Sequence, residues 1–284
     1  MKYTFPPGFD LARALELGTL VDAAYQQLAQ GTAWKPPAGY TILSPTLSST
    51  EVWKAHVVSS LLGPLGQQLP KVPFGFVATK GNDVYVVIRG TQTPLEWLDD
   101  FTAQPVPFEP GGQDWGHTTK GFSMLYGDIG PQILQALASP GVVGPGKSIY
   151  VTGHSLGAAL AHLAAAGVSV QFSPQIRPVS YTFCGPRAGG PAFAHAFATA
   201  QLVTWRIFNT EDLVPTVPPA AVLVTEPNMD MHGLTPLTQA LSSFVQLGLT
   251  GYQHIGYPIA ATFHDDTVAG NHNLDVLCTE INRP

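Results

Sequence analysis

The chain of 284 residues is poor in charged side chains and carries a modest negative charge. Asp, Glu, Lys and Arg make up 11% of it, against about a quarter of an average soluble domain, and the formal net charge is −6. This balance argues against the basic surface of a nucleic-acid-binding protein, so we expect no nucleic-acid partner.

The cysteines and the apolar stretches give no sign of a metal-binding ribbon or a membrane span. Cys184 and Cys278 are far apart and form no CxxC pair, which leaves two buried free thiols or one disulfide as alternatives. The start, MKYTFPPGFD, lacks the apolar core of a signal peptide, and the uncharged stretch 231–264 contains no continuous apolar span. We expect no transmembrane segment, and a location that is either cytoplasmic or secreted after trimming.

The first part of the chain predicts a helix and then a β-hairpin. Residues 11–30 follow Asp10, a favourable N-cap, and end at Gly31. Residues 74–91, FGFVATKGNDVYVVIRGT, alternate apolar and polar side chains on either side of KGND. This pattern is typical of two antiparallel strands, the second of which should end at Gly90.

The second part predicts strands that alternate with helices. SIYVTG (148–153) is a short β-branched run, and LGAALAHLAAAGVSV (156–170) favours a helix. The chain then reads as strand, helix and strand at PVSYTFCG, GPAFAHAFATA and LVTWRIFNT. Such alternation predicts an α/β fold with a central, mostly parallel sheet flanked by helices. Since no repeat or linker interrupts the pattern, we expect one domain over residues 1–284.

The pentapeptide GHSLG, residues 153–157, lies between the predicted strand and helix. A serine at such a sharp turn stands clear of its backbone and becomes a nucleophile when a base takes its proton. The glycines on either side avoid steric collisions, and the helix start directs its amides at a developing oxyanion. The pattern predicts Ser155 as the nucleophile and the Leu156 N–H as an oxyanion donor. The alternative is a serine that only caps the helix.

Five segments in chain order resemble those of the fungal-type class 3 lipases, a branch of the α/β-hydrolases. They are IRGTQTPLEWLDDF, HTTKGFSMLY, VTGHSLGAALAHLAA, YTFCGPRAGGPAFAHAF and FNTEDLVPTVPP. The resemblance extends from the first helix to the C-terminus. It implies an α/β-hydrolase fold with a lid, and ester hydrolysis without a metal or organic cofactor.

An acid and then a histidine should follow the serine in this fold. Asp212 comes just after a predicted strand, and the resemblance puts the family's acid there; the alternative is a loop aspartate bonded to its own backbone. Spacing alone leaves His254, His264 and His272 open as the base. The resemblance of GNHNLDVL to the family's last histidine block selects His272.

The resemblance also assigns Thr91, directly after the hairpin, as the second oxyanion donor; a plain β-turn is the alternative. His154 is expected to pack or to hydrogen-bond without transferring a proton. The run His264, Asp265 and Asp266 lacks a second pair of ligands, so it predicts a solvated loop and no metal site.

Two apolar stripes are expected near the substrate. Leu95, Trp97, Leu98 and Phe101 form one side of a short helix within 91–106, which suits a lid that opens at a lipid–water interface; a core-facing helix is the alternative. A longer insertion than the family pattern leads us to expect, 220–250, carries a second stripe of Leu237, Leu241, Phe244 and Leu247. This stripe would border the acyl pocket or pack on the core.

These observations predict a serine carboxylic-ester hydrolase, and most specifically a triacylglycerol lipase that acts on an acylglycerol or another ester. A feruloyl or aryl esterase and a phospholipase A1 are alternatives on the same scaffold. A binding or signalling module without catalysis is the alternative of a different class. Acyl-chain length, regioselectivity and oligomeric state are left open by the sequence.

Overall fold

The structure, a computed structural model, describes residues 3–50, 70–92, 104–218, 220 and 251–283. Two predicted features, the lid and the insertion, lie outside these ranges. The lid residues Leu95, Trp97, Leu98 and Phe101 lie outside the described residues, and so does the insertion 220–250 apart from Ala220.

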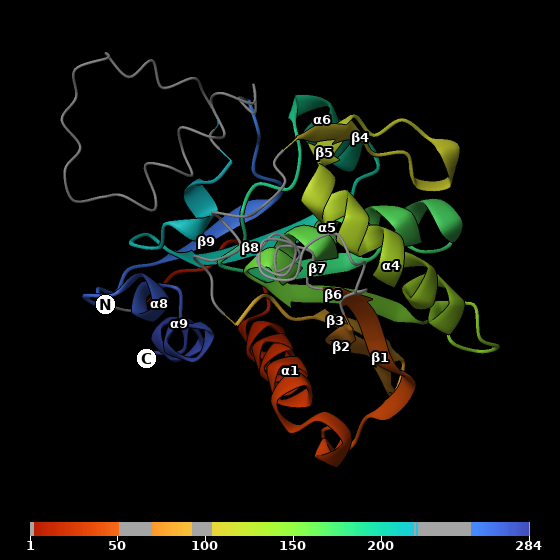
Figure 1. The fold of residues 1–284 in the computed structure, drawn as a ribbon, viewed down its shortest axis with the longest axis horizontal. Helices are drawn as coiled ribbons and strands as arrows, with labels where there is room; N and C mark the ends of the chain where they lie inside the picture. The colour runs from red at the N-terminus through yellow and green to blue at the C-terminus, as the bar shows by residue number, and fades with distance from the viewer. Residues whose placement is uncertain (1–2, 51–69, 93–103, 219, 221–250, 284) are drawn as a thin grey trace, which may run out of the picture.

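In the described part of the chain, a seven-stranded sheet runs through the centre in the order β1-β2-β3-β6-β7-β8-β9 (Figure 1). The strands are β1 (Thr41–Thr50), β2 (Lys71–Lys80), β3 (Asp83–Ile88), β6 (Ser148–His154), β7 (Val179–Phe183), β8 (Val203–Asn209) and β9 (Tyr257–Ala261). The β1–β2 and β2–β3 pairs are antiparallel, and the four pairs from β3 to β9 are parallel. The predicted mostly parallel sheet is confirmed. A short pair, β4 (Pro105–Pro107) and β5 (His117–Thr119), lies apart from it.

Helices cover both faces of the sheet, as predicted (Figure 1). On one face lie α1 (Leu11–Gln30) and α9 (Leu274–Ile281), which contact each other and the sheet. On the other face lie α4 (Lys120–Leu137), α5 (Leu156–Gln171) and α6 (Pro191–Thr199). The short elements are α8 (Val268–Asn271), η1 (Gly31–Ala33), η2 (Pro110–Gly112) and η3 (Val214–Thr216).

The predicted elements form where their local signals are strong. Asp10 caps α1 by accepting a hydrogen bond from the Arg13 N–H at 3.1 Å, and Gly31 ends the helix with φ 55°. The hairpin forms as β2 and β3, but β3 ends at Ile88. The expected end at Gly90 is wrong by two residues, because the chain there leaves the sheet to pack against α1 and the start of α5.

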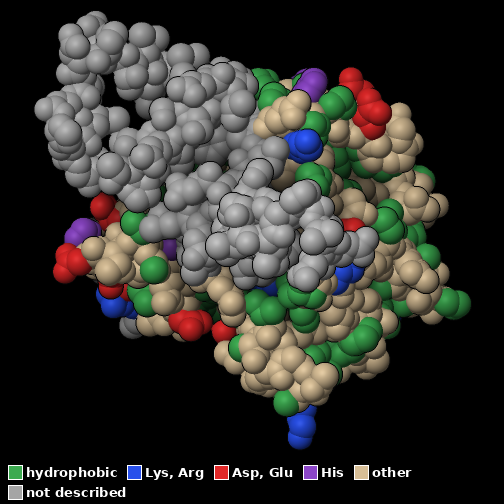
Figure 2. Space-filling view, in the orientation of Figure 1, with side chains coloured by type: hydrophobic (Ala, Val, Ile, Leu, Met, Phe, Trp, Pro, Cys, Tyr) green, Lys and Arg blue, Asp and Glu red, His purple; other side chains and the backbone are tan. Residues whose placement is uncertain are grey.

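Helix α5 lies at the centre of the molecule, and every residue from Leu156 to Ser169 is buried. Its small side chains allow close approach to the sheet below and to α4 beside it. Figure 2 shows a surface in which Lys, Arg, Asp and Glu are scattered among uncharged side chains, in keeping with the low charge content. None of the helices in the described ranges combines the length and the apolar character needed to cross a bilayer.

The buried His162 on α5 makes stability depend on pH. Burial, aided by Arg206, lowers the pKa of His162 to about 3, so the folded state keeps it neutral while the unfolded chain takes up a proton below about pH 6.5. Above about pH 6.5, protonation of His162 therefore does not reduce the free energy of unfolding. As the pH falls towards 3, this free energy decreases by up to about 1.4 kcal/mol per pH unit. Urea unfolding of His162→Gln across this range should show a shallower loss of stability than the wild type. Equal slopes would contradict the assignment.

Candidate active site

The turn from β6 into α5 holds Ser155 in an unusual backbone conformation. Its φ is 58° and its ψ is −130°, a region that costs energy for a residue with a side chain and often marks functional sites. The Ser155 N–H donates to the Phe183 carbonyl of β7 at 2.9 Å, which holds the turn against the sheet. The side chain makes no capping bond to α5, so the capping alternative is wrong. Within the described residues, the buried Ser155 Oγ has no hydrogen-bond partner.

The two glycines of GHSLG are required by close packing, as predicted. A Cβ at Gly153 would collide with the carbonyl of Gly157, and a Cβ at Gly157 would collide with the carbonyls of Ile88 and Arg89. The start of α5 therefore lies directly against the end of β3. Any larger side chain at either glycine would move the backbone that holds Ser155.

His272 and Asp212 form a buried pair beside this turn. His272 Nδ1 lies 2.7 Å from Asp212 Oδ2, and Asp212 Oδ1 accepts a hydrogen bond from the Val214 N–H at 3.0 Å. Because a carboxylate only accepts, Nδ1 carries the proton and Nε2 keeps its lone pair. His272 Nε2 is buried and has no partner in the described part of the chain. It does not bond Ser155 Oγ in this structure; such bonds are often long in the absence of substrate.

The other two candidates for the catalytic base, His254 and His264, lie in places that do not suit this role. Burial, together with Arg206 and Arg187, lowers the pKa of His254 to about 3, which makes it a poor base near neutral pH. His264 is exposed and lies 3.6 Å from Asp266 Oδ1, in the solvated loop that was predicted. Among the described histidines, His272 alone is bonded to Asp212.

Both expected oxyanion donors lie at the turn. Leu156 and Thr91 are buried, and Leu156 begins α5 directly after the serine. A Cβ at Gly90 would lie 2.7 Å from both the Ser155 Cβ and the His154 carbonyl, so the segment that continues into Thr91 passes beside the serine. A pocket of about 400 Å³ opens here, and its lining includes Thr91, His154 and His272.

Asn209 belongs to the site, although the sequence predicts no role for it. Its Oδ1 accepts hydrogen bonds from the N–H groups of Glu211 and Phe263, at 3.3 and 3.1 Å. Its Nδ2 donates to the carbonyl of Asn271 at 3.0 Å. The fully buried amide thus ties the loop that carries Asp212 to the residue before His272. The sequence feature that could have indicated this role is the position of Asn209 in FNTEDLVP, three residues before Asp212.

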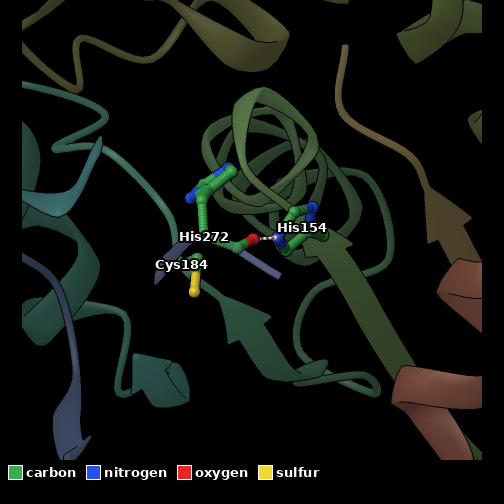
Figure 3. Close-up of side chains that lie close together, drawn as sticks. All are labelled: His154, Cys184 and His272. Atoms are coloured by element: carbon green, nitrogen blue, oxygen red, sulfur yellow. Dashed lines mark hydrogen bonds between the residues drawn. The ribbon is translucent and has the colours of Figure 1, made fainter. Parts of the chain in front are cut away.

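Cys184 lies close to His154 and His272 (Figure 3). Its thiol is fully buried; burial first, and the charge of Asp212 second, raise the pKa of the thiol, which stays protonated. Ligand atoms of the three residues lie within 4.8 Å of one another. Both ring nitrogens of His154 already have hydrogen-bond partners and the thiol keeps its proton, so this group is poorly suited to a metal ion. Both cysteines are free, and Cys278 is partly exposed.

Part of the chain matches a known protein family. The family model described as "Lipase (class 3)" matches residues 85–222, a range that contains Ser155 and Asp212. The chain is therefore similar to the class 3 lipases over the segment that holds these two residues. The range matched by the class 3 lipase model includes neither α1 nor His272.

Similar proteins include a fungal lipase and a plant phospholipase. The lipase of Rhizomucor miehei is 33% identical over 140 residues, which are 49% of this chain and 38% of that protein. Phospholipase A1-II 1 of Oryza sativa subsp. indica is 36% identical over 155 residues, 48% of this chain and 39% of that protein. The matches thus span well under half the length of these relatives.

A solved structure of the Rhizomucor miehei lipase in complex with its propeptide has the same fold. The two agree with a TM-score of 0.61 at 20% identity, over 91% of this chain and 69% of that chain. The predicted α/β-hydrolase fold is confirmed.

Loss of the Asn209 side chain should destabilise the fold. Asn209→Ala leaves the Asn271 carbonyl and the Phe263 N–H without their partner inside the protein, which costs about 1–3 kcal/mol. Urea unfolding measures this change directly. Asn282→Ala, at an exposed position after α9, is the control and should stay within about 0.5 kcal/mol of the wild type. Equal stability of the two variants would contradict the role of Asn209.

Proposed function

We propose that this protein is a serine carboxylic-ester hydrolase, and most specifically a triacylglycerol lipase, with Ser155, His272 and Asp212 as its triad. The observation that carries the proposal is the buried pair of His272 and Asp212, joined at 2.7 Å, with a free Nε2 beside a serine of strained backbone. The family match over residues 85–222, the lipase relative and the turn geometry around Ser155 support the same assignment.

The reaction proceeds through an acyl-enzyme. Ser155 Oγ attacks the acyl carbonyl carbon while its proton passes to His272 Nε2. The N–H groups of Thr91 and Leu156 hold the oxyanion, and when the tetrahedral intermediate collapses the ester C–O bond breaks and the alcohol leaves with the proton from His272. Water then attacks the acyl group, giving its proton to His272, and the carboxylic acid leaves as Ser155 regains its hydrogen.

Asp212 supports this sequence in two ways. Its hydrogen bond keeps the proton of His272 on Nδ1, so that Nε2 stays available, and its charge stabilises the imidazolium that forms during attack. Since both side chains are buried, water screens this attraction little. The Val214 N–H donates to the same carboxylate and helps to orient it.

The substrate class rests on the relatives and on the sequence. The Rhizomucor miehei enzyme, described as a triacylglyceride lipase, favours a triacylglycerol, and the rice phospholipase A1 supports the phospholipid alternative. The lid within 91–106, the apolar stripe of 220–250 and contact with a lipid–water interface stay predictions from the sequence, as does a single domain over residues 1–284. A lid that turns an apolar face outwards would favour water-insoluble esters.

Substitution of the triad should abolish ester hydrolysis. Ser155→Ala and His272→Ala should lower kcat on p-nitrophenyl esters by at least about 10³-fold, because each removes a group that acts in the transition state. A series of acyl chains from acetate to stearate, assayed beside emulsified trioleoylglycerol, phosphatidylcholine and methyl ferulate, separates the three substrate classes.

His254→Ala is the matched control for the base. It should keep kcat within about threefold of the wild type, provided that the variant folds, because His254 is not bonded to Asp212 and is no general base. Full activity of Ser155→Ala would refute the mechanism. A higher kcat/KM for phosphatidylcholine or methyl ferulate than for trioleoylglycerol would refute the lipase assignment while leaving the triad in place.

A further inference from the structure

A series of hydrogen bonds joins helix α1 to three parts of the proposed active site. The Gly90 N–H donates to the Tyr25 hydroxyl at 3.0 Å. The same hydroxyl lies 2.8 Å from His154 Nδ1. His154 Nε2 in turn lies 3.0 Å from the backbone carbonyl oxygen of His272, the contact drawn in Figure 3. Tyr25 belongs to α1, outside the range of the family match.

The direction of each of these bonds follows from chemistry. A carbonyl only accepts, so His154 Nε2 carries the ring proton and donates to His272. His154 Nδ1 is then the acceptor, and the Tyr25 O–H donates to it while its oxygen accepts from Gly90. Burial lowers the pKa of His154 well below its ordinary value and raises that of Tyr25, so neither group changes charge near neutral pH. All hydrogen bonds of this series therefore form between neutral groups.

Three members of this series lie next to, or belong to, residues of the proposed chemistry. Gly90 precedes Thr91, His154 precedes Ser155, and the last acceptor is the backbone of His272 itself. Gly90 has to be glycine for this approach, since a Cβ there would lie 2.6 Å from the Tyr25 hydroxyl oxygen. The rings also pack: the centroids of His154 and His272 are 4.5 Å apart, and those of Tyr25 and His154 are 5.9 Å apart.

We propose that Tyr25 and His154 are positioning residues, which hold the oxyanion segment at Gly90 and the backbone of His272 in register with Ser155. The inference rests on the proposed function. Asp212 holds the ring of His272, whereas His154 holds its main chain. Since a shift of about 1 Å in a catalytic group costs about 100-fold in rate, loss of this support should appear in kcat.

The same contacts exclude other roles for His154. Both of its ring nitrogens are in use, so it has no free lone pair with which to take a proton from Ser155. Its tie to His272 is to the main chain and not to the reacting ring nitrogen. His154 therefore acts through the position of His272 and does not touch the substrate's reacting atoms.

The test compares variants that remove these hydrogen bonds with variants that keep them. Tyr25→Phe and His154→Leu should each lower kcat about 10- to 100-fold on a soluble p-nitrophenyl ester, with KM within about twofold of the wild type. His154→Gln offers an amide N–H and a carbonyl oxygen in place of the two ring nitrogens and should keep most of the activity. The double variant Tyr25→Phe/His154→Leu should lose no more than the larger single loss, because both act through one series of bonds.

The matched control is Tyr126→Phe. Tyr126 is a partly buried tyrosine of α4 whose hydroxyl lies against Gly167, three turns along α5 from the serine, and desolvation raises its pKa to about 12. Removal of the Tyr126 hydroxyl should leave kcat unchanged, although it removes the same oxygen atom as Tyr25→Phe. Active sites are counted by labelling Ser155 with a phosphonate ester, so that kcat refers to folded enzyme only.

The outcomes separate this inference from the function on which it rests. If Ser155→Ala keeps its activity, the proposed function is wrong, and the positioning role with it. If Ser155→Ala is inactive but Tyr25→Phe has the kcat of the wild type per labelled serine, only the positioning role is wrong. Equal losses in His154→Gln and His154→Leu, or an additive double variant, would also overturn it.

Discussion

The close approach of α5 to the end of β3 is the constraint on which the site depends. Gly153 and Gly157 have no side chain because the carbonyls of Ile88 and Arg89 and the turn itself occupy that space. The turn is held to β7 by the bond from the Ser155 N–H to the Phe183 carbonyl, and this fixes a φ of 58° at the serine. The burial of α5 on all sides supplies the packing that stabilises such a conformation.

The polar groups around this turn are held mainly by bonds to the main chain. The Asn209 amide donates to the carbonyl of Asn271, and His154 donates to the carbonyl of His272, so two side chains from the parallel sheet support neighbouring residues at the end of α8. Asp212 then needs to orient only the ring of His272. In a buried site each of these bonds also removes the cost of an unpaired carbonyl, which joins the stability of the fold to the geometry of the site.

Sequence patterns predicted the elements whose signals are local. The helix after Asp10, the hairpin around KGND and the strand and helix around GHSLG all formed near their expected bounds. The edge strands β1 and β9 were not predicted, because each contains a proline and β1 is rich in serine and threonine without a clear alternation. The helices α4 and α9 also escaped prediction, the first with Pro131 within it and the second with only eight residues.

The sequence by itself determined the α/β fold class, the family resemblance and Ser155 and Asp212 as candidates, because each depends on a short run of neighbouring residues. Only the tertiary structure decided which histidine meets Asp212, since the two are 60 positions apart and spacing left His254 and His264 open. The same holds for Tyr25, which meets His154 across 129 positions. Contacts of this kind are made by the packing of α1 and the C-terminal loop onto one end of the sheet, and no local pattern encodes them.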